Sequence, residues 1–145
     1  MPDQPIIGIR PLFQGDTVAE NAHALAFRDI RPQAPVHILV IPRGRYVSYD
    51  DFAANASDAE IVGFNRLVAQ VARDQGLSLA EGGKGFRAIT NSGEHGVQEV
   101  PHFHLHLLGG LHARDRGQRV VGRPRHGRAA PADLRALAQQ AQHGV

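Results

Sequence analysis

Three histidines at alternate positions, His102, His104 and His106, are the residues in this sequence with the clearest capacity for chemistry. Apolar residues such as Phe103 and Leu105 occupy the positions between them. Because successive side chains of a β-strand point to opposite faces, this alternation predicts a strand over residues 101–108. Such a strand places the three imidazoles in one row and the apolar side chains in a core.

The row has three interpretations. The imidazoles could be polar side chains on a sheet face that is exposed to water, or they could be ligands of a catalytic zinc ion. They could also form a nucleophilic site, because a neutral imidazole can attack phosphorus and give a covalent intermediate. We favour this third interpretation, with His104 as nucleophile because it alone has an imidazole on each side. His102 and His106 would then bond the phosphoryl oxygens or protonate the leaving group.

Other segments of the chain must position this row of histidines. Their pattern predicts an α+β domain, with one long helix packed on an antiparallel sheet. Further strands are predicted over residues 23–29, 36–42 and 86–91, and the first two are antiparallel neighbours because their connection is short. Ser57 and Glu60 form a capping box, and the apolar stripe after them predicts a helix that ends near Gly76. Residues 46–54 are predicted to form a loop or a short helix, and residues 6–18 an irregular segment or a short strand.

Composition and charge indicate a soluble, cytoplasmic, one-domain protein. The sequence has no cysteine, which excludes disulfides and thiolate metal sites, and we find neither a signal-peptide pattern nor an apolar run of ~20 residues. Residues 1–113 hold nine Lys and Arg against twelve Asp and Glu, whereas residues 114–145 hold seven Arg against two Asp. We therefore predict a domain over residues 1–112 and an Arg-rich extension with a short helix over residues 113–145. We expect this extension to be solvated or to contact a second subunit, rather than to bind nucleic acid.

Polar residues in other segments are candidate helpers of the row. His37 is the one polar residue in an otherwise aliphatic predicted strand, and Asn91, Gln98 and Glu99 lie in the segment that leads to the histidines. Glycines in the same segment allow backbone N–H groups to approach an anion closely. Each residue alone is also explained by an ordinary structural role, so these residues support the nucleophilic interpretation only as a group.

The triad and the residues that follow it, up to Gly110, resemble the histidine triad superfamily, in particular its purine nucleoside phosphoramidase branch. Residues 26–42, 85–87 and 91–110 resemble the same branch, so the similarity covers about residues 20–112. The resemblance implies a five-stranded antiparallel sheet with one major helix. It also implies a homodimer in which the sheets of the two subunits join.

The implied reaction is attack by His104 on the α-phosphorus of a nucleoside 5′-phosphoramidate such as an AMP–amine. The amine leaves, and water then releases the nucleoside monophosphate from the nucleotidyl-histidine. The resemblance implies a purine nucleotide substrate, with no metal and no other cofactor. It assigns catalytic roles to His104, His102, His106 and His37, the ribose hydroxyls to Asp29, part of the base pocket to Ile30, and polar contacts with phosphate and leaving group to Asn91 and Gln98.

Glu99 departs from the family pattern, because a serine stands at this position in the best-known member. An ionised carboxylate cannot donate the hydrogen bond that a hydroxyl donates. The segment before residue 18 also matches the family poorly. Two alternatives therefore stay open, a dinucleoside polyphosphate hydrolase of the same superfamily and a purine nucleotide-binding regulatory protein with little turnover.

Overall fold

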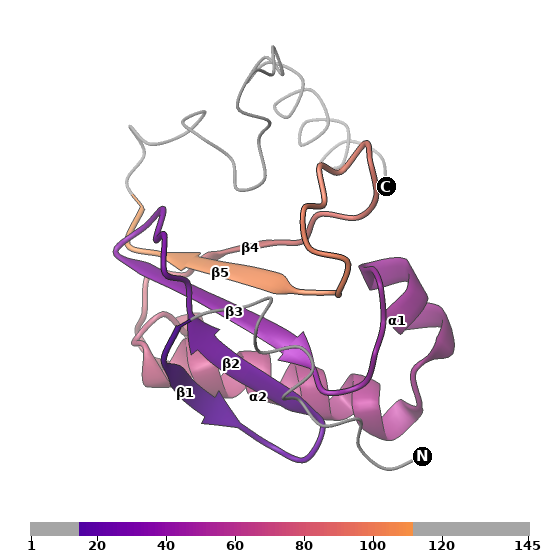
Figure 1. The fold of residues 1–145 in the computed structure, drawn as a ribbon. Coiled ribbons are helices and arrows are strands. Elements are labelled where there is room, and N and C mark those ends of the chain that lie inside the picture. The colour runs from indigo at the N-terminus through magenta and orange to yellow at the C-terminus, as the bar shows by residue number, and fades with distance from the viewer. Residues whose placement is uncertain (1–14, 112–145) are drawn as a thin grey trace, which may run out of the picture.

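The structure, a computed structural model, describes residues 15–111 and contains one five-stranded antiparallel sheet (Figure 1). The strand order is β1-β2-β3-β5-β4, so the last strand in the sequence lies inside the sheet. This confirms the predicted five-stranded antiparallel sheet and the pairing of the first two predicted strands as neighbours. The strands are β1 (Thr17–Glu20), β2 (Ala24–Arg28), β3 (Val36–Pro42), β4 (Arg87–Ile89) and β5 (Leu105–Gly109). The predictions for residues 6–14 and 113–145 lie outside the described residues.

The one long helix is α2 (Asp58–Asp74), and its ends follow the predicted signals. The Ser57 hydroxyl accepts the N–H of Glu60 at 3.2 Å, and the Glu60 carboxylate accepts the N–H of Ser57 at 3.1 Å. These two bonds satisfy donors that have no partner within the helix. Gly76 follows the helix with φ of 71°, a conformation that glycine adopts without steric cost. The segment predicted as a loop or short helix over residues 46–54 forms a short helix, α1 (Tyr49–Asn55), and a 3-10 turn, η3 (Leu79–Glu81), precedes β4.

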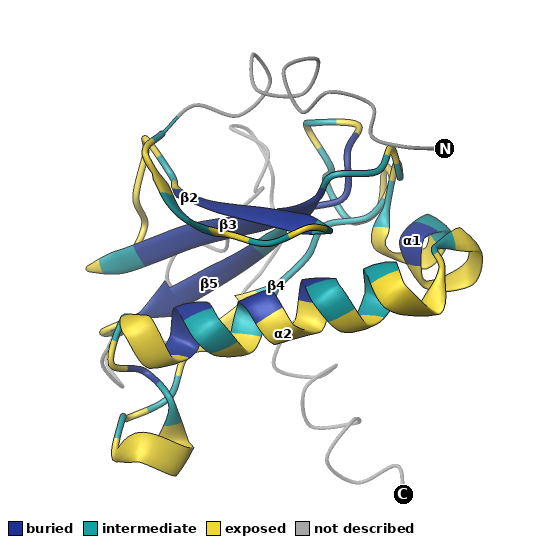
Figure 2. Ribbon diagram, turned by 90° about the horizontal axis from the view of Figure 1, so that it is seen from below, coloured by how far each residue is buried: buried dark blue, intermediate teal, exposed yellow. Residues whose placement is uncertain are grey.

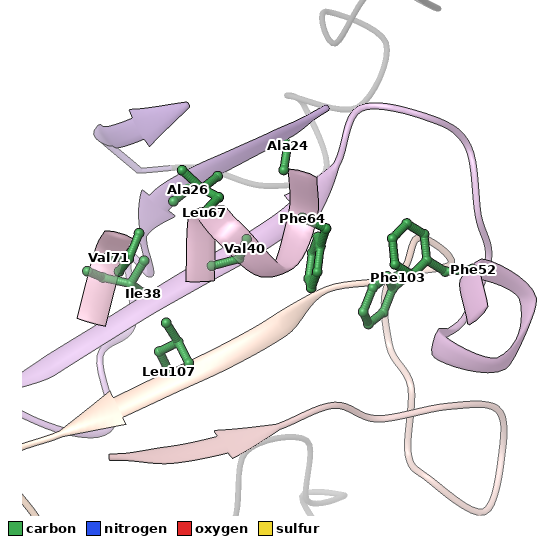
Figure 3. Packing of buried hydrophobic residues seen from close by; sticks show 10 residues of the cluster. All are labelled: Ala24, Ala26, Ile38, Val40, Phe52, Phe64, Leu67, Val71, Phe103 and Leu107. Carbon is green, nitrogen blue, oxygen red and sulfur yellow. The ribbon is translucent and has the colours of Figure 1, made fainter. Parts of the chain in front are cut away.

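The main core lies between the sheet and α2. Figure 2 shows that the buried positions of α2 face the strands, while its other side is exposed. Burial of one large apolar side chain stabilises a fold by about 1.5–3 kcal/mol, so this cluster (Figure 3), to which β5 contributes Leu107, helps to hold β5 in place. The buried residues of the cluster are Ala24, Ala26, Ile38, Val40, Phe52, Phe64, Leu67, Val71, Phe103 and Leu107.

The opposite face of the sheet carries a smaller buried cluster, formed by Leu25, Phe27, Leu39 and Ile41. Leu39 pairs with His106 across β3 and β5, so this second face is also the face of the histidines. None of the helices within residues 15–111 has both the length and the apolar character to cross a membrane.

Two strands are at least three residues shorter than predicted. The histidine strand begins at Leu105 rather than at residue 101, because the N–H of Phe103 bonds the carbonyl of Tyr46 in a loop (2.7 Å) and no strand pairs there. The preceding strand comprises only Arg87–Ile89 instead of residues 86–91, since its register with β5 covers only those three positions. The alternation nevertheless holds, because Phe103 and Leu107 both belong to the core under α2.

Candidate active site

Two neighbouring strands bring His37 and His106 together on one face of the sheet. In the β3–β5 register, His37 pairs with Leu108 and Leu39 pairs with His106, so the two histidines are diagonal neighbours. Their rings are in hydrogen-bond contact, with His37 Nε2 2.9 Å from His106 Nδ1. Both side chains are buried.

His104 lies just before β5 and is held from two sides. Its Nδ1 lies 2.7 Å from the carbonyl oxygen of His102, and its own carbonyl accepts a hydrogen bond from the Thr90 hydroxyl at 2.9 Å. Because a carbonyl oxygen can only accept, Nδ1 of His104 must carry a proton. In the neutral ring the lone pair is therefore at Nε2, and this is the nitrogen that can act as a nucleophile.

The protonation state of His104 favours the nucleophilic form. Burial lowers the pKa of His104 below its ordinary value, although the bond to the His102 carbonyl and the charges of Asp29 and Glu99 act in the opposite direction. The net effect keeps the ring neutral near pH 7.

His102 completes the triad, in the segment that leads into β5. Its Nε2 lies 3.1 Å from the carbonyl oxygen of Pro42, the last residue of β3, and therefore donates to it. Burial is the largest cause of a lowered pKa for His102, and the neighbouring His104 lowers it further. His106 is affected most, because burial together with two neighbouring imidazoles lowers its pKa to about 3.

Within residues 15–111, Asp29, His37 and His106 form a group that could hold a metal ion, since one potential ligand atom from each lies within 4.8 Å of the others. Oδ2 of Asp29 is 3.4 Å from His37 Nε2, and its Oδ1 accepts the N–H of Arg31 at 2.8 Å. Hydrogen bonds also connect these residues. Nε2 of His37 contacts Nδ1 of His106, and Nδ1 of His37 accepts the main-chain N–H of Gln33 at 3.0 Å. The group therefore has a consistent structure without a metal ion.

The other predicted site residues lie around the triad in different surroundings. Ile30 is 55% exposed and follows Asp29 at the end of β2, a position from which an apolar side chain can meet a ligand. Asn91 donates to the carbonyl of Gly96 at 2.7 Å, and Glu99 is exposed. Ile30 and Glu99 are thus exposed, in contrast to the buried histidines.

The side chain of Gln98 stabilises the loop before the triad through hydrogen bonds. Its side-chain nitrogen donates to the carbonyls of Val47 and Val100, while its oxygen accepts the N–H of Gly93 at 2.9 Å. Val97, the residue before it, has φ of 58°, which is uncommon for a β-branched residue and costs about 1–3 kcal/mol. The loop is therefore held in a strained conformation next to the histidines.

Sequence reasoning missed three groups of this site. The carbonyl of Tyr46 and the N–H of Gln33 are main-chain groups, so no residue type signals them. The third is the Thr90 hydroxyl, which donates to the carbonyl of His104. Thr90 lies within the strand predicted over residues 86–91, so its place beside the histidine strand was a signal that could have identified it.

The comparisons with known proteins agree with this geometry. The model of the HIT domain family matches residues 13–113. The chain belongs to the HIT family. This HIT protein is 56% identical over 93 residues to an uncharacterised HIT-like protein of Azospirillum brasilense, in an alignment covering 64% of this chain and 73% of the relative.

Two further relatives bear on the function of this HIT protein. It is 39% identical over 105 residues to the purine nucleoside phosphoramidase of Escherichia coli, covering 70% of this chain and 82% of that protein. Among solved structures, the HIT family hydrolase of Legionella pneumophila has a TM-score of 0.58 and 37% sequence identity, covering 70% and 87% of the two chains.

Proposed function

We propose that this HIT protein hydrolyses the P–N bond of nucleoside 5′-phosphoramidates of the AMP–amine type. The observation that carries the proposal is the hydrogen bond from His104 Nδ1 to the His102 carbonyl, which leaves the nucleophilic lone pair at Nε2. The lowered pKa of His104 supports it, because a protonated ring could not attack. The similarity to a purine nucleoside phosphoramidase of Escherichia coli supports the type of substrate.

The reaction has two displacements at phosphorus. In the first, Nε2 of His104 bonds to the α-phosphorus, and the amine leaves with the electron pair of the P–N bond and takes up a proton. In the second, water attacks the same phosphorus, the bond to His104 breaks, and a nucleoside monophosphate is released. Division into two steps lowers the barrier of each, and the Nε2–H of His106 stabilises the charge on the phosphoryl oxygens, while the carbonyl of His102 keeps the proton of His104 on Nδ1.

The remaining residues form the proposed substrate contacts. Asp29 accepts hydrogen bonds from the ribose hydroxyls, and Ile30 packs against a purine base, for which its exposed apolar side chain is suited. Asn91 and Glu99 contact the phosphate and the leaving group, and Gln98 contributes only its side-chain oxygen, because its side-chain nitrogen donates to the carbonyls of Val47 and Val100. A purine nucleotide is therefore the proposed partner, and no resident metal takes part in the proposed steps.

We further propose that the protein forms a homodimer. Strand β4 lies at the edge of the sheet, and Arg87 and Ala88 in it are exposed. The apolar side chains of Leu79 and Phe86, which precede it, are 75% and 40% exposed. An edge strand next to exposed apolar residues is suited to pairing with a second copy. Size-exclusion chromatography with light scattering tests this, and a monomer at micromolar concentration would contradict it.

The test of the reaction is turnover of a fluorogenic adenosine phosphoramidate. We expect His104→Ala to lower kcat/KM by about 10³-fold or more, as loss of a covalent nucleophile does. His95→Ala is the matched control, because His95 is an exposed loop histidine, and it should retain wild-type activity. Equal rates for wild type and His104→Ala would remove His104 as nucleophile. Acid quenching and peptide mass spectrometry should locate the nucleotidyl adduct on His104.

The same assay separates the two alternative functions. Diadenosine polyphosphate as a parallel substrate identifies a dinucleoside polyphosphate hydrolase if it is turned over faster than the phosphoramidate. Binding of AMP without turnover of either compound identifies a nucleotide-binding regulatory protein. Either result would overturn the proposed reaction.

A further inference from the structure

We propose that the main-chain N–H of Gln33 fixes the tautomer of His37 and, through it, makes His106 a permanently neutral hydrogen-bond donor. His106 is then a group that binds the phosphoryl oxygens and not the acid that protonates the leaving group. The assignment of the tautomers rests on the geometry of the free protein, while the role toward phosphate rests on the proposed function.

The first step concerns His37. The main-chain N–H of Gln33 points at His37 Nδ1 from 3.0 Å. An amide N–H can only donate, so Nδ1 must hold a lone pair. A neutral His37 therefore carries its proton at Nε2, and a doubly protonated His37 would lose the bond to Gln33.

The contacts of His37 Nε2 agree with this assignment. This nitrogen faces Oδ2 of Asp29 at 3.4 Å and Nδ1 of His106 at 2.9 Å. An ionised carboxylate is an acceptor only, so it favours a proton on the nitrogen that it faces. If His106 Nδ1 donated instead, His37 would have a proton on neither nitrogen and would be an anion next to Asp29. Like charges in a buried site make that arrangement strongly unfavourable.

The second step concerns His106. Its Nδ1 accepts the proton of His37, so the neutral ring carries its own proton at Nε2. The His106 side chain is buried, with 5% exposure, and within residues 15–111 no acceptor bonds to this Nε2. A buried donor without an acceptor is costly, which indicates that a ligand supplies the acceptor. The ring of His106 lies beside that of His104, with 5.0 Å between the centroids, so an oxygen bound there is also next to the nucleophile.

This arrangement decides between the two roles that the sequence leaves open for His106. To become an acid, His106 must first be protonated at Nδ1, the position at which the Nε2–H of His37 already points. The lowered pKa of His106 agrees with this obstruction. The proton for the departing amine must therefore come from another group, and His106 contributes by stabilising charge.

The direct test is the tautomeric state of the histidines in the substrate-free protein, measured by long-range ¹H–¹⁵N NMR on ¹⁵N-histidine-labelled protein. We expect His37 and His106 to be neutral with the proton at Nε2 between pH 6 and pH 8, and His104 to show the opposite tautomer. A proton on Nδ1 of His106, or a doubly protonated His106 at pH 7, would overturn the proposal. This outcome does not depend on any substrate, so it is distinguishable from failure of the proposed function.

A matched pair at Gln33 tests the origin of the effect. Gln33→Ala keeps the main-chain N–H and should leave the tautomers of His37, His104 and His106 as they are in the wild type. Gln33→Pro removes the N–H, and we expect His37 to become protonated at Nδ1 at a higher pH than in the wild type. If the spectrum of the proline variant shows His37 and His106 unchanged, the N–H of Gln33 does not set the tautomers.

A second pair at His37 tests the link to activity. His37→Gln can still donate from its amide nitrogen to His106 Nδ1, whereas His37→Leu cannot. We expect kcat on the phosphoramidate to fall less than about tenfold in the glutamine variant and about 10²-fold or more in the leucine variant. Equal losses in the two variants, or an unchanged His106 tautomer in His37→Leu, would contradict the proposal. Should His37→Leu not fold, the wild-type spectrum alone decides.

Discussion

Acid should destabilise this protein through its buried histidines, and His106 permits a quantitative prediction. Burial and two neighbouring imidazoles lower the pKa of His106 to about 3, whereas an unfolded chain has a histidine pKa near 6.5. The unfolded state therefore binds a proton at a pH at which the folded state does not. Stability is lost as the pH falls below about 6.5, and the loss continues down to the folded pKa.

The magnitude follows from the difference between the two pKa values. Between pH 7 and pH 5 the unfolded His106 becomes almost fully protonated while the folded one stays neutral, which lowers the free energy of unfolding by about 2 kcal/mol. The lowered pKa values of His37, His102 and His104 add further losses in the same direction. The wild type should thus lose more than the contribution of His106 alone.

The assay is urea unfolding, followed by far-UV circular dichroism, of wild type and His106→Asn at pH 7 and pH 5. The variant should lose about 2 kcal/mol less than the wild type over this interval, because asparagine does not titrate. His95→Asn removes an exposed histidine and should lose as much as the wild type. An equal loss in wild type and His106→Asn would refute the reasoning, since His106 would then titrate alike in both states.

Three further outcomes follow from features described above. Ser57→Ala should lower the free energy of unfolding by about 1 kcal/mol in urea titrations, whereas Ser78→Ala should not, because Ser78 precedes η3 without a side-chain capping bond. Val97→Gly should keep the thermal midpoint of the wild type or raise it, since glycine relieves the strain at φ of 58°, while Val100→Gly should lower it through lost packing. Dialysis of the protein against a chelator should leave phosphoramidate turnover unchanged. A loss of turnover that added zinc restores would show that Asp29, His37 and His106 bind a metal ion that the reaction needs.

Much of the fold could be predicted because its signals are local. The alternation of histidine and apolar residues predicts which side chains enter the core, and Phe103 and Leu107 do so. The capping box at Ser57 and Glu60 is also a local signal, and the helix begins after it. The family resemblance then supplies the number of strands, which short apolar segments do not determine alone.

The parts that sequence reasoning could not give depend on contacts between distant segments. The histidine strand begins only at Leu105 because the preceding backbone bonds to Tyr46, which is more than fifty residues away in the sequence. The partner of His37 Nδ1 is a backbone N–H, which is present at almost every residue and thus carries no sequence signal. The burial that lowers the pKa values of the histidines is a property of the folded chain as a whole.

The position of β5 between β3 and β4 also affects the order in which the nascent chain can fold. Strands β1 to β3 are consecutive and can pair as they leave the ribosome, but β4 has no strand beside it until β5 has been synthesised. Ile38 and Leu107 are nearly seventy residues apart, and closure of such a long loop is a slow step in folding. The histidines are thus assembled last, when the final strand of the sheet inserts at its interior, so a partly translated chain cannot yet carry out the chemistry of the finished one.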